Sequence, residues 1–142
     1  MAQHGQALEE ALGQLLLQRS RSRLLQATLA AAPAGVDAHN YAVLSGLARI
    51  GPATAARLAG EIGIDRSGAS RHADRLVKAG LLRREPDPSD GRGTLLVLTE
   101  TGEETVAALR GALARHLDAR TASWPPGLAE AVIDGLHRLV AD

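Results

Sequence analysis

The chain has 142 residues, 45% of them hydrophobic but with one Trp, one Tyr and no Phe, and its 16 cationic and 16 anionic side chains give a net charge of zero. Such a chain is long enough for one domain with its own core, and the absence of cysteine excludes disulfides, thiolate metal sites and thiol-based redox sensing. It has no run of about 20 apolar residues and no basic start followed by an apolar block, so we expect a cytoplasmic protein with no membrane partner.

The N-terminal part predicts two helices. The first runs from about residue 7 to 31, where leucines recur at helical spacing with polar residues between them, and Pro33 and Gly35 end the pattern. At about 1.5 Å per residue this helix is about 36 Å long. The second helix is predicted over 37–50, with Asp37 as its N-cap.

A helix-turn-helix is predicted at the centre of the chain. Thr54 caps a short helix that ends near residue 61, and Gly63 makes the turn because glycine tolerates positive φ. Asp65 then caps a second helix, which Gly80 ends. A helix-turn-helix uses its second helix to present side chains to a DNA groove.

A hairpin follows the second of these helices. Segments 81–85 and 94–98 are strand-like, and Asp90-Gly91 between them is a typical hairpin-turn sequence. Such a hairpin beside a helix-turn-helix forms a wing. It adds a second arm with which the protein can contact DNA.

The C-terminal part predicts two more helices. Thr99 caps a helix that extends to about residue 122, a Trp-Pro-Pro-Gly sequence at 124–127 breaks the chain, and a last helix carries an apolar stripe. Long apolar stripes outside a winged helix must be buried against something. We therefore favour a two-fold homodimer, and packing of the end helices on their own domain is the alternative.

Together these elements predict a mostly α fold with a small β wing. Residues 37–102 form a winged helix-turn-helix lobe, residues 1–36 an N-terminal dimerisation helix, and residues 103–142 the C-terminal dimerisation helices. The three segments are expected to form one continuous domain.

The second helix of the helix-turn-helix has two faces at helical spacing. The apolar face carries Ala69, Ala73, Leu76 and Val77, and the opposite face carries Ser67, Ser70, Arg71, Asp74, Arg75 and Lys78. Arginine can bond guanine or clamp a phosphate, and small serines allow close approach to the groove. Asp74 is expected to orient Arg71 or Arg75 by ion pairing, with a plain helix-surface charge as the alternative.

The charge of the chain is concentrated around this helix. Residues 64–84 carry six cations and two anions, whereas residues 93–142 carry four arginines and seven acids. An uneven field matters more for binding a polyanion than the overall sum. A solvated helix surface explains the same charges, so they do not decide the function alone.

The hairpin carries further candidate contacts. Arg92 is expected to project from the loop, where it can enter a narrow minor groove, and Asp90 to hold the loop and the Arg92 guanidinium. Arg83 and Arg84 alternate faces, so one can reach a phosphate while the other packs or pairs. The predicted DNA-binding residues are Ser67, Ser70, Arg71, Arg75, Lys78, Arg84, Asp90 and Arg92.

The segment from about 51 to 102 resembles the MarR family of winged helix-turn-helix transcriptional regulators. That family has a DxR motif in the wing and an LTxxG-like sequence after it, and here these are Asp90-Gly91-Arg92 and the LTETG sequence at 98–102. The residues Ser67, Ser70, Arg71, Asp74, Arg75, Leu76 and Gly80 also fall where the family has similar types. The resemblance implies a homodimer that binds pseudo-palindromic double-stranded DNA, often as a repressor released by a small-molecule effector.

The chain departs from the family pattern at His72, where an aliphatic residue is usual. A structural role at the edge of the core is favoured there over a DNA contact. The peroxide-sensing branch of the family needs a reactive cysteine, so that mechanism is excluded.

The resemblance also implies where an effector binds, between the dimerisation helices and the DNA-binding lobe. The candidates for such contact are Arg23, His39, Tyr41 and His116, each with a purely structural role as the alternative. The five histidines show no HxxxH or HxH spacing, so we expect no metal site and no cofactor.

Two rival classes of function remain to be compared. An enzyme is not expected, because the chain has no GxSxG, P-loop or HExxH motif. A winged-helix module that binds proteins rather than DNA predicts a second helix poor in cations, and the exposed face described above argues against it.

Overall fold

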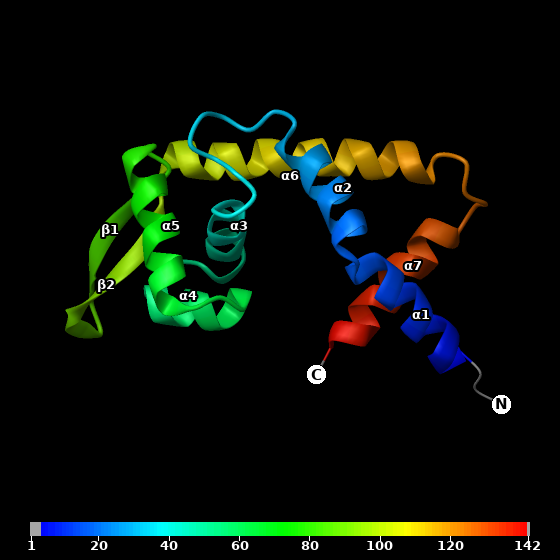
Figure 1. The fold of residues 1–142 in the computed structure, drawn as a ribbon, viewed down its shortest axis with the longest axis horizontal. Helices are drawn as coiled ribbons and strands as arrows, with labels where there is room; N and C mark the ends of the chain where they lie inside the picture. The colour runs from blue at the N-terminus through cyan, green and yellow to red at the C-terminus, as the bar shows by residue number, and fades with distance from the viewer. Residues whose placement is uncertain (1–3, 142) are drawn as a thin grey trace.

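The computed structural model describes residues 4–141, and over these it is mostly helical with one antiparallel hairpin, as predicted (Figure 1). The elements are α1 (His4–Leu16), α2 (Gln18–Leu29), α3 (Tyr41–Ile50), α4 (Ala55–Ile62), α5 (Arg66–Lys78), β1 (Leu82–Asp87), β2 (Asp90–Leu98), α6 (Glu100–Thr121) and α7 (Leu128–Val140). No helix in this part of the chain is both long and apolar enough to cross a bilayer.

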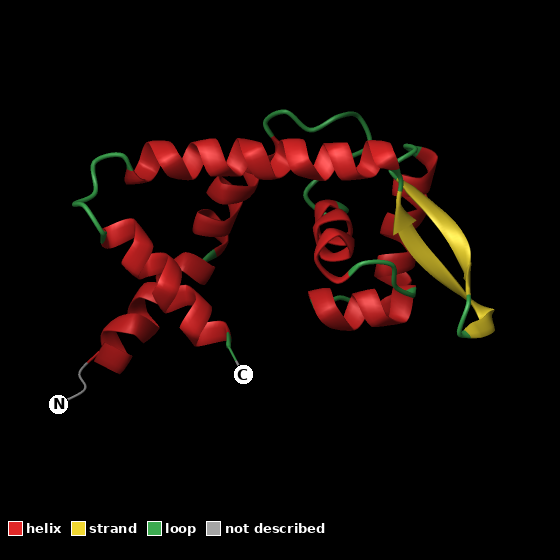
Figure 2. Ribbon diagram, turned by 180° about the vertical axis from the view of Figure 1, so that it is seen from behind, coloured by secondary structure: helices red, strands yellow, loops and turns green. Residues whose placement is uncertain are grey.

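Helix α6 runs along the long axis of the molecule and joins its two ends. Helices α3, α4 and α5 and the hairpin gather at one end, while α1 and α7 lie at the other (Figure 2). Helix α2 packs against α6 between them. The arrangement separates a winged helix-turn-helix lobe from a second, purely helical end.

The main cluster of buried apolar side chains lies in the winged helix-turn-helix lobe and the first half of α6. Its buried members are Val43, Leu44, Leu47, Ala53, Leu58, Ala73, Leu76, Leu81, Leu82, Leu96 and Val106. They come from α3, α4, α5, the hairpin, the adjoining loops and the first half of α6, whereas neither α1 nor α7 contributes a buried residue. The lobe therefore closes its core together with the first half of α6.

The local signals of the helix-turn-helix are confirmed. The Thr54 hydroxyl accepts a hydrogen bond from the Arg57 backbone N–H at 3.2 Å and caps α4, and Gly63 ends that helix with a φ of 73°. The Asp65 carboxylate caps α5 by accepting from the Gly68 N–H at 2.9 Å. Gly63 and the Asp65 cap thus fix the turn between α4 and α5.

The N-terminal segment is two helices rather than the single helix predicted over 7–31. Leu17 has an extended backbone, with φ −58° and ψ 142°. The Ser20 hydroxyl donates to the Gln14 carbonyl at 2.8 Å, a carbonyl that a continuous helix would pair with a backbone N–H. The break turns α1 toward α7, and Leu8 shares a cavity with Val132.

The helix predicted to begin at residue 37 begins at Tyr41 instead. The Asp37 carboxylate does cap backbone N–H groups, but those of His39 and Asn40, at 2.9 and 2.8 Å. The Asp37 carboxylate therefore stabilises a tight turn at the end of the loop, and α3 starts after that turn.

The predicted hairpin is present, but its turn lies two residues earlier than Asp90-Gly91. The strands pair regularly up to Pro86 and Thr94, and the chain reverses at 88–89. The Asp87 carboxylate accepts from both the N–H and the hydroxyl of Ser89, at 2.9 and 2.7 Å. This Asx turn fixes the reversal before Asp90 is reached.

Helix α6 begins in close contact with the end of α5. Thr99 caps it by accepting from the Gly102 N–H at 3.0 Å, and the same hydroxyl donates to the Gly80 carbonyl at 2.7 Å. A Cβ on Gly102 would lie 2.0 Å from the carbonyl oxygen of Leu81. The first turn of α6 thus rests directly on backbone, and glycine alone fits there.

Gly102→Ala is expected to destabilise the fold by at least about 2 kcal/mol, because the backbone at Leu81 must move to admit the methyl group. The free energy of unfolding in urea measures this. Gly60→Ala is the control: it lies inside α4 with no atom within 4 Å of an added Cβ. It should gain up to about 1 kcal/mol, and a Gly102→Ala variant as stable as the wild type would contradict the close contact.

Candidate nucleic-acid interface and adjoining cavity

The two faces predicted for α5 are observed. Ala69, Ala73 and Leu76 are buried in the lobe, while Arg71 and Lys78 are exposed on the opposite side. Within residues 4–141 neither of these two cations forms an ion pair. Both are therefore available to an anionic partner.

Arg75 has protein partners. Its guanidinium lies 3.4 Å from the Asp37 carboxylate and 2.7 Å from Nδ1 of His72. Burial of His72, and after it the neighbouring Arg75 guanidinium, lower the pKa of the imidazole. His72 is half-buried and contacts Arg75 and His39 rather than projecting alone, in line with the structural role expected for it.

The expected role of Asp74 is wrong. Its carboxylate pairs with Arg84 of β1 at 2.5 Å, and not with Arg71 or Arg75. Helix spacing alone suggested a partner on the same helix, whereas the wing brings a strand arginine across the helix surface. Arg83, the neighbour of Arg84, pairs with Glu85 at 2.7 Å.

A cationic cleft lies between the N-terminus of α4, α5 and the wing. It has a volume of about 270 Å³, and three arginines, Arg66, Arg84 and Arg92, line it together with Ser70 and Thr54. Guanidinium groups beside the N-terminus of a helix suit a phosphate. The sequence analysis counted the charge of Arg66 but missed it as a site residue, although Arg66 lies one turn before Ser70 and so shares its side of α5.

The wing presents Arg92 on an irregular stretch of β2. Asp90 accepts a hydrogen bond from the Arg92 backbone N–H at 3.1 Å, so it holds the shape of the loop as expected. It forms no ion pair with the Arg92 guanidinium, contrary to the second part of that expectation. The exposed guanidinium is left to line the cationic cleft.

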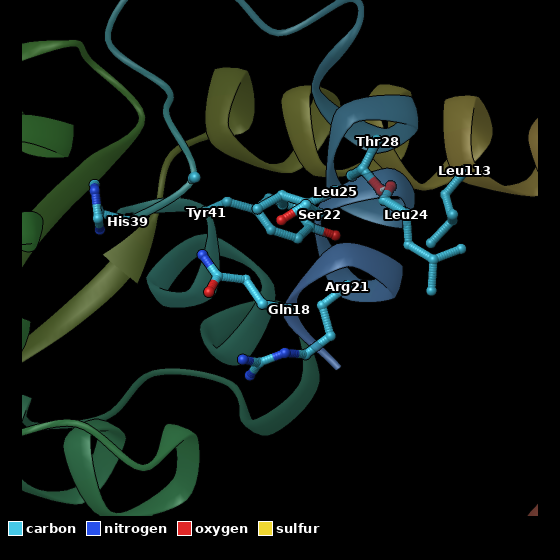
Figure 3. Close-up of a pocket in the computed structure, with 10 residues that line it drawn as sticks. Gln18, Arg21, Ser22, Leu24, Leu25, Thr28, His39, Tyr41 and Leu113 are labelled. Atoms are coloured by element: carbon cyan, nitrogen blue, oxygen red, sulfur yellow. Dashed lines mark hydrogen bonds between the residues drawn. The ribbon is translucent and has the colours of Figure 1, made fainter. Parts of the chain in front are cut away.

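A second cavity, of about 650 Å³, lies between α2, the start of α3 and α6 (Figure 3). Its lining residues are Gln18, Arg21, Ser22, Leu24, Leu25, Thr28, Ala38, His39, Tyr41 and Leu113. Polar groups of α2 face the Tyr41 ring, and His39 lies on the side toward α5. We call this space the α2–α3 cavity.

The α2–α3 cavity includes two of the four predicted effector residues. His39 and Tyr41 line it, whereas Arg23 and His116 do not. Residues 18, 21, 22 and 25 share one face of α2, so Arg21 lines the cavity in place of Arg23. On α6 the lining position is Leu113, one turn before His116. In the described residues no group of three or more histidines and acids is placed to hold a metal ion.

A family model supports the assignment of the winged helix-turn-helix. The model of the MarR family matches residues 34–93, which span the end of the α2–α3 loop, the helix-turn-helix and most of the hairpin. The winged helix-turn-helix of this chain is that of the MarR family. MarR-family proteins are transcriptional regulators, which are not a class of enzymes.

Relatives and solved structures agree with this MarR-family assignment. Over 73 residues the chain is 36% identical to YxaD of Bacillus subtilis strain 168, named as an uncharacterised HTH-type transcriptional regulator, and the match covers 51% of each protein. The chain thus spans about half the length of the curated relative it matches.

Two solved structures extend the likeness beyond the helix-turn-helix. A MarR family protein from Bacillus stearothermophilus has a TM-score of 0.80 at 20% identity, covering 98% of this chain and 95% of that chain. The PcaV transcriptional regulator of Streptomyces coelicolor, solved with its natural ligand, has a TM-score of 0.62 at 25% identity, covering 86% of each chain. The MarR fold therefore includes the helical end of this chain.

Acidification should destabilise this MarR-family fold through three aspartates at its turns. Hydrogen bonds lower the pKa of each carboxyl, chiefly from the Asn40 N–H to Asp37, from the Ser67 hydroxyl to Asp65 and from Ser89 to Asp87. Because their pKa values are lower folded than unfolded, their stabilisation is complete above about pH 4 and is lost as pH falls through the folded values.

Thermal denaturation at a series of pH values checks this. Asp65→Asn keeps an oxygen that can accept from Gly68 but loses the charge. It should be less stable than the wild type at about pH 7, and the difference should shrink as the pH falls below about 4. Parallel curves for the two proteins would show that Asp65 is not a source of the acid sensitivity.

Proposed function

We propose that the chain is a dimeric, sequence-specific regulator that binds double-stranded DNA, a repressor at pseudo-palindromic operators, and that a small-molecule effector releases it. The observation that carries this proposal is the exposed cationic face of α5 beside the cationic cleft of the wing. A helix with a buried apolar face and exposed arginines suits the major groove, and the adjacent cleft suits the phosphate backbone.

The proposed DNA contacts divide by the chemistry they offer. Arg71, Ser67 and Ser70 on α5 would read base edges, and Arg92 would reach the minor groove. Lys78 and Arg84, with Arg66 added to the predicted set, would bind phosphates. Arg66 and Arg84 line the cationic cleft. Asp90 acts through the loop that carries Arg92, and Arg75 must first leave Asp37.

The exposed apolar surface supports a homodimer. The exposed large hydrophobic residues are Leu8, Leu12, Leu15, Leu16, Leu17, Leu117, Trp124, Leu128, Val132, Ile133, Leu136, Leu139 and Val140. All belong to α1, α7, the residue after α1, the end of α6 or the loop before α7, and none to the helix-turn-helix. A second copy of the chain would cover them. A two-fold axis there can set two α5 helices about 34 Å apart, one DNA turn.

The α2–α3 cavity is the proposed effector site. Arg21, Gln18 and Ser22 offer donors beside Tyr41 and the apolar Leu25, a lining that suits a small organic anion with an apolar body. The similar PcaV protein was solved with its natural ligand, which supports a small-molecule effector for this chain too. A winged-helix module that binds protein instead of DNA has less support, because the face of α5 is cationic.

Arg71→Ala is expected to weaken binding to a DNA site by at least about 1 kcal/mol if this arginine contacts a base. The measurement is fluorescence anisotropy on a labelled duplex selected by the wild-type protein from a random-sequence pool, at several salt concentrations. Arg110→Ala on the exposed side of α6 removes the same charge away from α5 and should bind like the wild type. Equal affinity of both variants would reject the assigned face.

Leu136→Glu is expected to convert the dimer to a monomer, because it places a charge in the exposed apolar surface of α7. Sedimentation velocity distinguishes the 14.8 kDa chain from its dimer. Ala108→Glu introduces the same side chain on the exposed part of α6 that lies beside the lobe, and should leave the dimer intact. A wild-type protein that sediments as a monomer would overturn the dimer outright.

A further inference from the structure

The loop between α2 and α3 contacts both the α2–α3 cavity and helix α5. His39 lines the cavity, and its ring stacks on that of His72 with centroids 6.2 Å apart and planes 7° from parallel. His72 belongs to α5, the helix proposed to enter DNA. This stack is therefore a direct physical link between the cavity and the proposed DNA-binding helix.

The same loop also contacts Arg75, which lies one turn after His72 on α5. Arg75 donates to Nδ1 of His72 at 2.7 Å and lies 3.4 Å from the carboxylate of Asp37. Nδ1 can accept from a guanidinium when the His72 ring is neutral with its proton on Nε2. Arg75 therefore has one partner in the loop, Asp37, and one on its own helix, His72.

The loop is held as one unit. Asn40 is fully buried; its side chain donates to the Gly35 carbonyl at 2.6 Å and accepts from the Asp37 N–H at 2.8 Å. The Asp37 carboxylate in turn accepts from the His39 N–H at 2.9 Å. Asp37 and His39 are therefore fixed relative to each other. Asp37 contacts Arg75 directly, and His39 contacts it through His72.

The ion pair is weak enough to exchange partners. The side chains of Arg75 and Asp37 are 52% and 45% exposed, and an exposed pair of this kind gains little over hydration. A DNA phosphate or guanine offers the same guanidinium a strong bidentate partner. Nη1 and Nη2 of Arg75 already contact Asp37 and His72, so this pair of nitrogens must leave them before it can form a bidentate contact with DNA.

We propose that Asp37 and His72 are positioning residues that hold the Arg75 guanidinium away from DNA, and that His39 braces this hold from the α2–α3 cavity. The inference rests on the DNA-binding role proposed above and adds its regulation. An occupant of the cavity that packs on the exposed side of His39 fixes the stack and keeps Arg75 on Asp37. DNA binding selects the opposite state, so the two ligands oppose each other through this cluster.

The test is Asp37→Asn, which keeps an oxygen to accept the loop N–H groups but removes the charge that attracts Arg75. With the selected duplex described above, its affinity should exceed that of the wild type by about 3- to 10-fold, with a steeper salt dependence. Glu61→Gln removes an acidic charge from α4 and controls for general electrostatics. A gain of the same size in both variants would overturn the proposal.

The decisive comparison uses the Arg75→Ala background. There Asp37→Asn should give no gain, because the arginine it releases is absent, and His39→Ala should raise affinity only when Arg75 is present. A gain that persists without Arg75, or no gain in either variant, overturns the positioning role. If the wild-type protein selects no duplex, the proposed function fails as well, and this result is distinct from a wild type that binds and a variant that gains nothing.

A measurement without DNA tests the cluster itself. In the free protein the pKa of His72, followed by NMR titration, should rise in Arg75→Ala, because the guanidinium opposes protonation of the ring. It should fall in Asp37→Asn, because the carboxylate favours protonation. A His72 pKa that neither substitution moves would show that the three side chains do not meet, and would overturn the proposal.

Discussion

The contact between the first turn of α6 and the backbone at Leu81 is the constraint on which the rest of the structure depends. Because Gly102 has no side chain, the helix comes within reach of the Leu81 carbonyl, and Thr99 bonds to Gly80 at the same place. This contact fixes the direction of a helix of 22 residues, about 33 Å long. It thereby fixes how the lobe, the α2–α3 cavity and the C-terminal end stand relative to one another.

The chain divides its apolar side chains between two uses. Those of α3, α4, α5, the hairpin and the first half of α6 close a core, whereas those of α1 and α7 stay exposed. A helix that buries nothing in its own chain is stable when something else covers it. The division explains how a chain with almost no aromatic residues can fold one lobe by itself and leave a second surface for association.

A net charge of zero is compatible with a polyanion partner because the charges are matched locally. Arg75, Arg83 and Arg84 each have an acidic partner, while Arg66, Arg71 and Arg92 have none within residues 4–141. The ion pairs hold the paired arginines in place with little change in free energy, and the unpaired arginines supply the positive electrostatic potential. The same arrangement makes it possible for internal acids to compete with DNA.

The sequence by itself determined the features that depend on residues three or four apart. The caps Thr54, Asp65 and Thr99, the turn at Gly63 and the two faces of α5 were all predictable, because a cap or a helical face involves only near neighbours. These local rules were sufficient for the fold class and for the cationic face.

The tertiary structure alone decided which side chains meet across elements. It paired Asp74 with Arg84, brought Asp37 of a loop to Arg75 of α5, and put Arg21 rather than Arg23 into the cavity. It also placed Arg66 with the wing. Such contacts depend on the angles between helices and strands. The packing of the whole core sets these angles, and no short stretch of sequence encodes them.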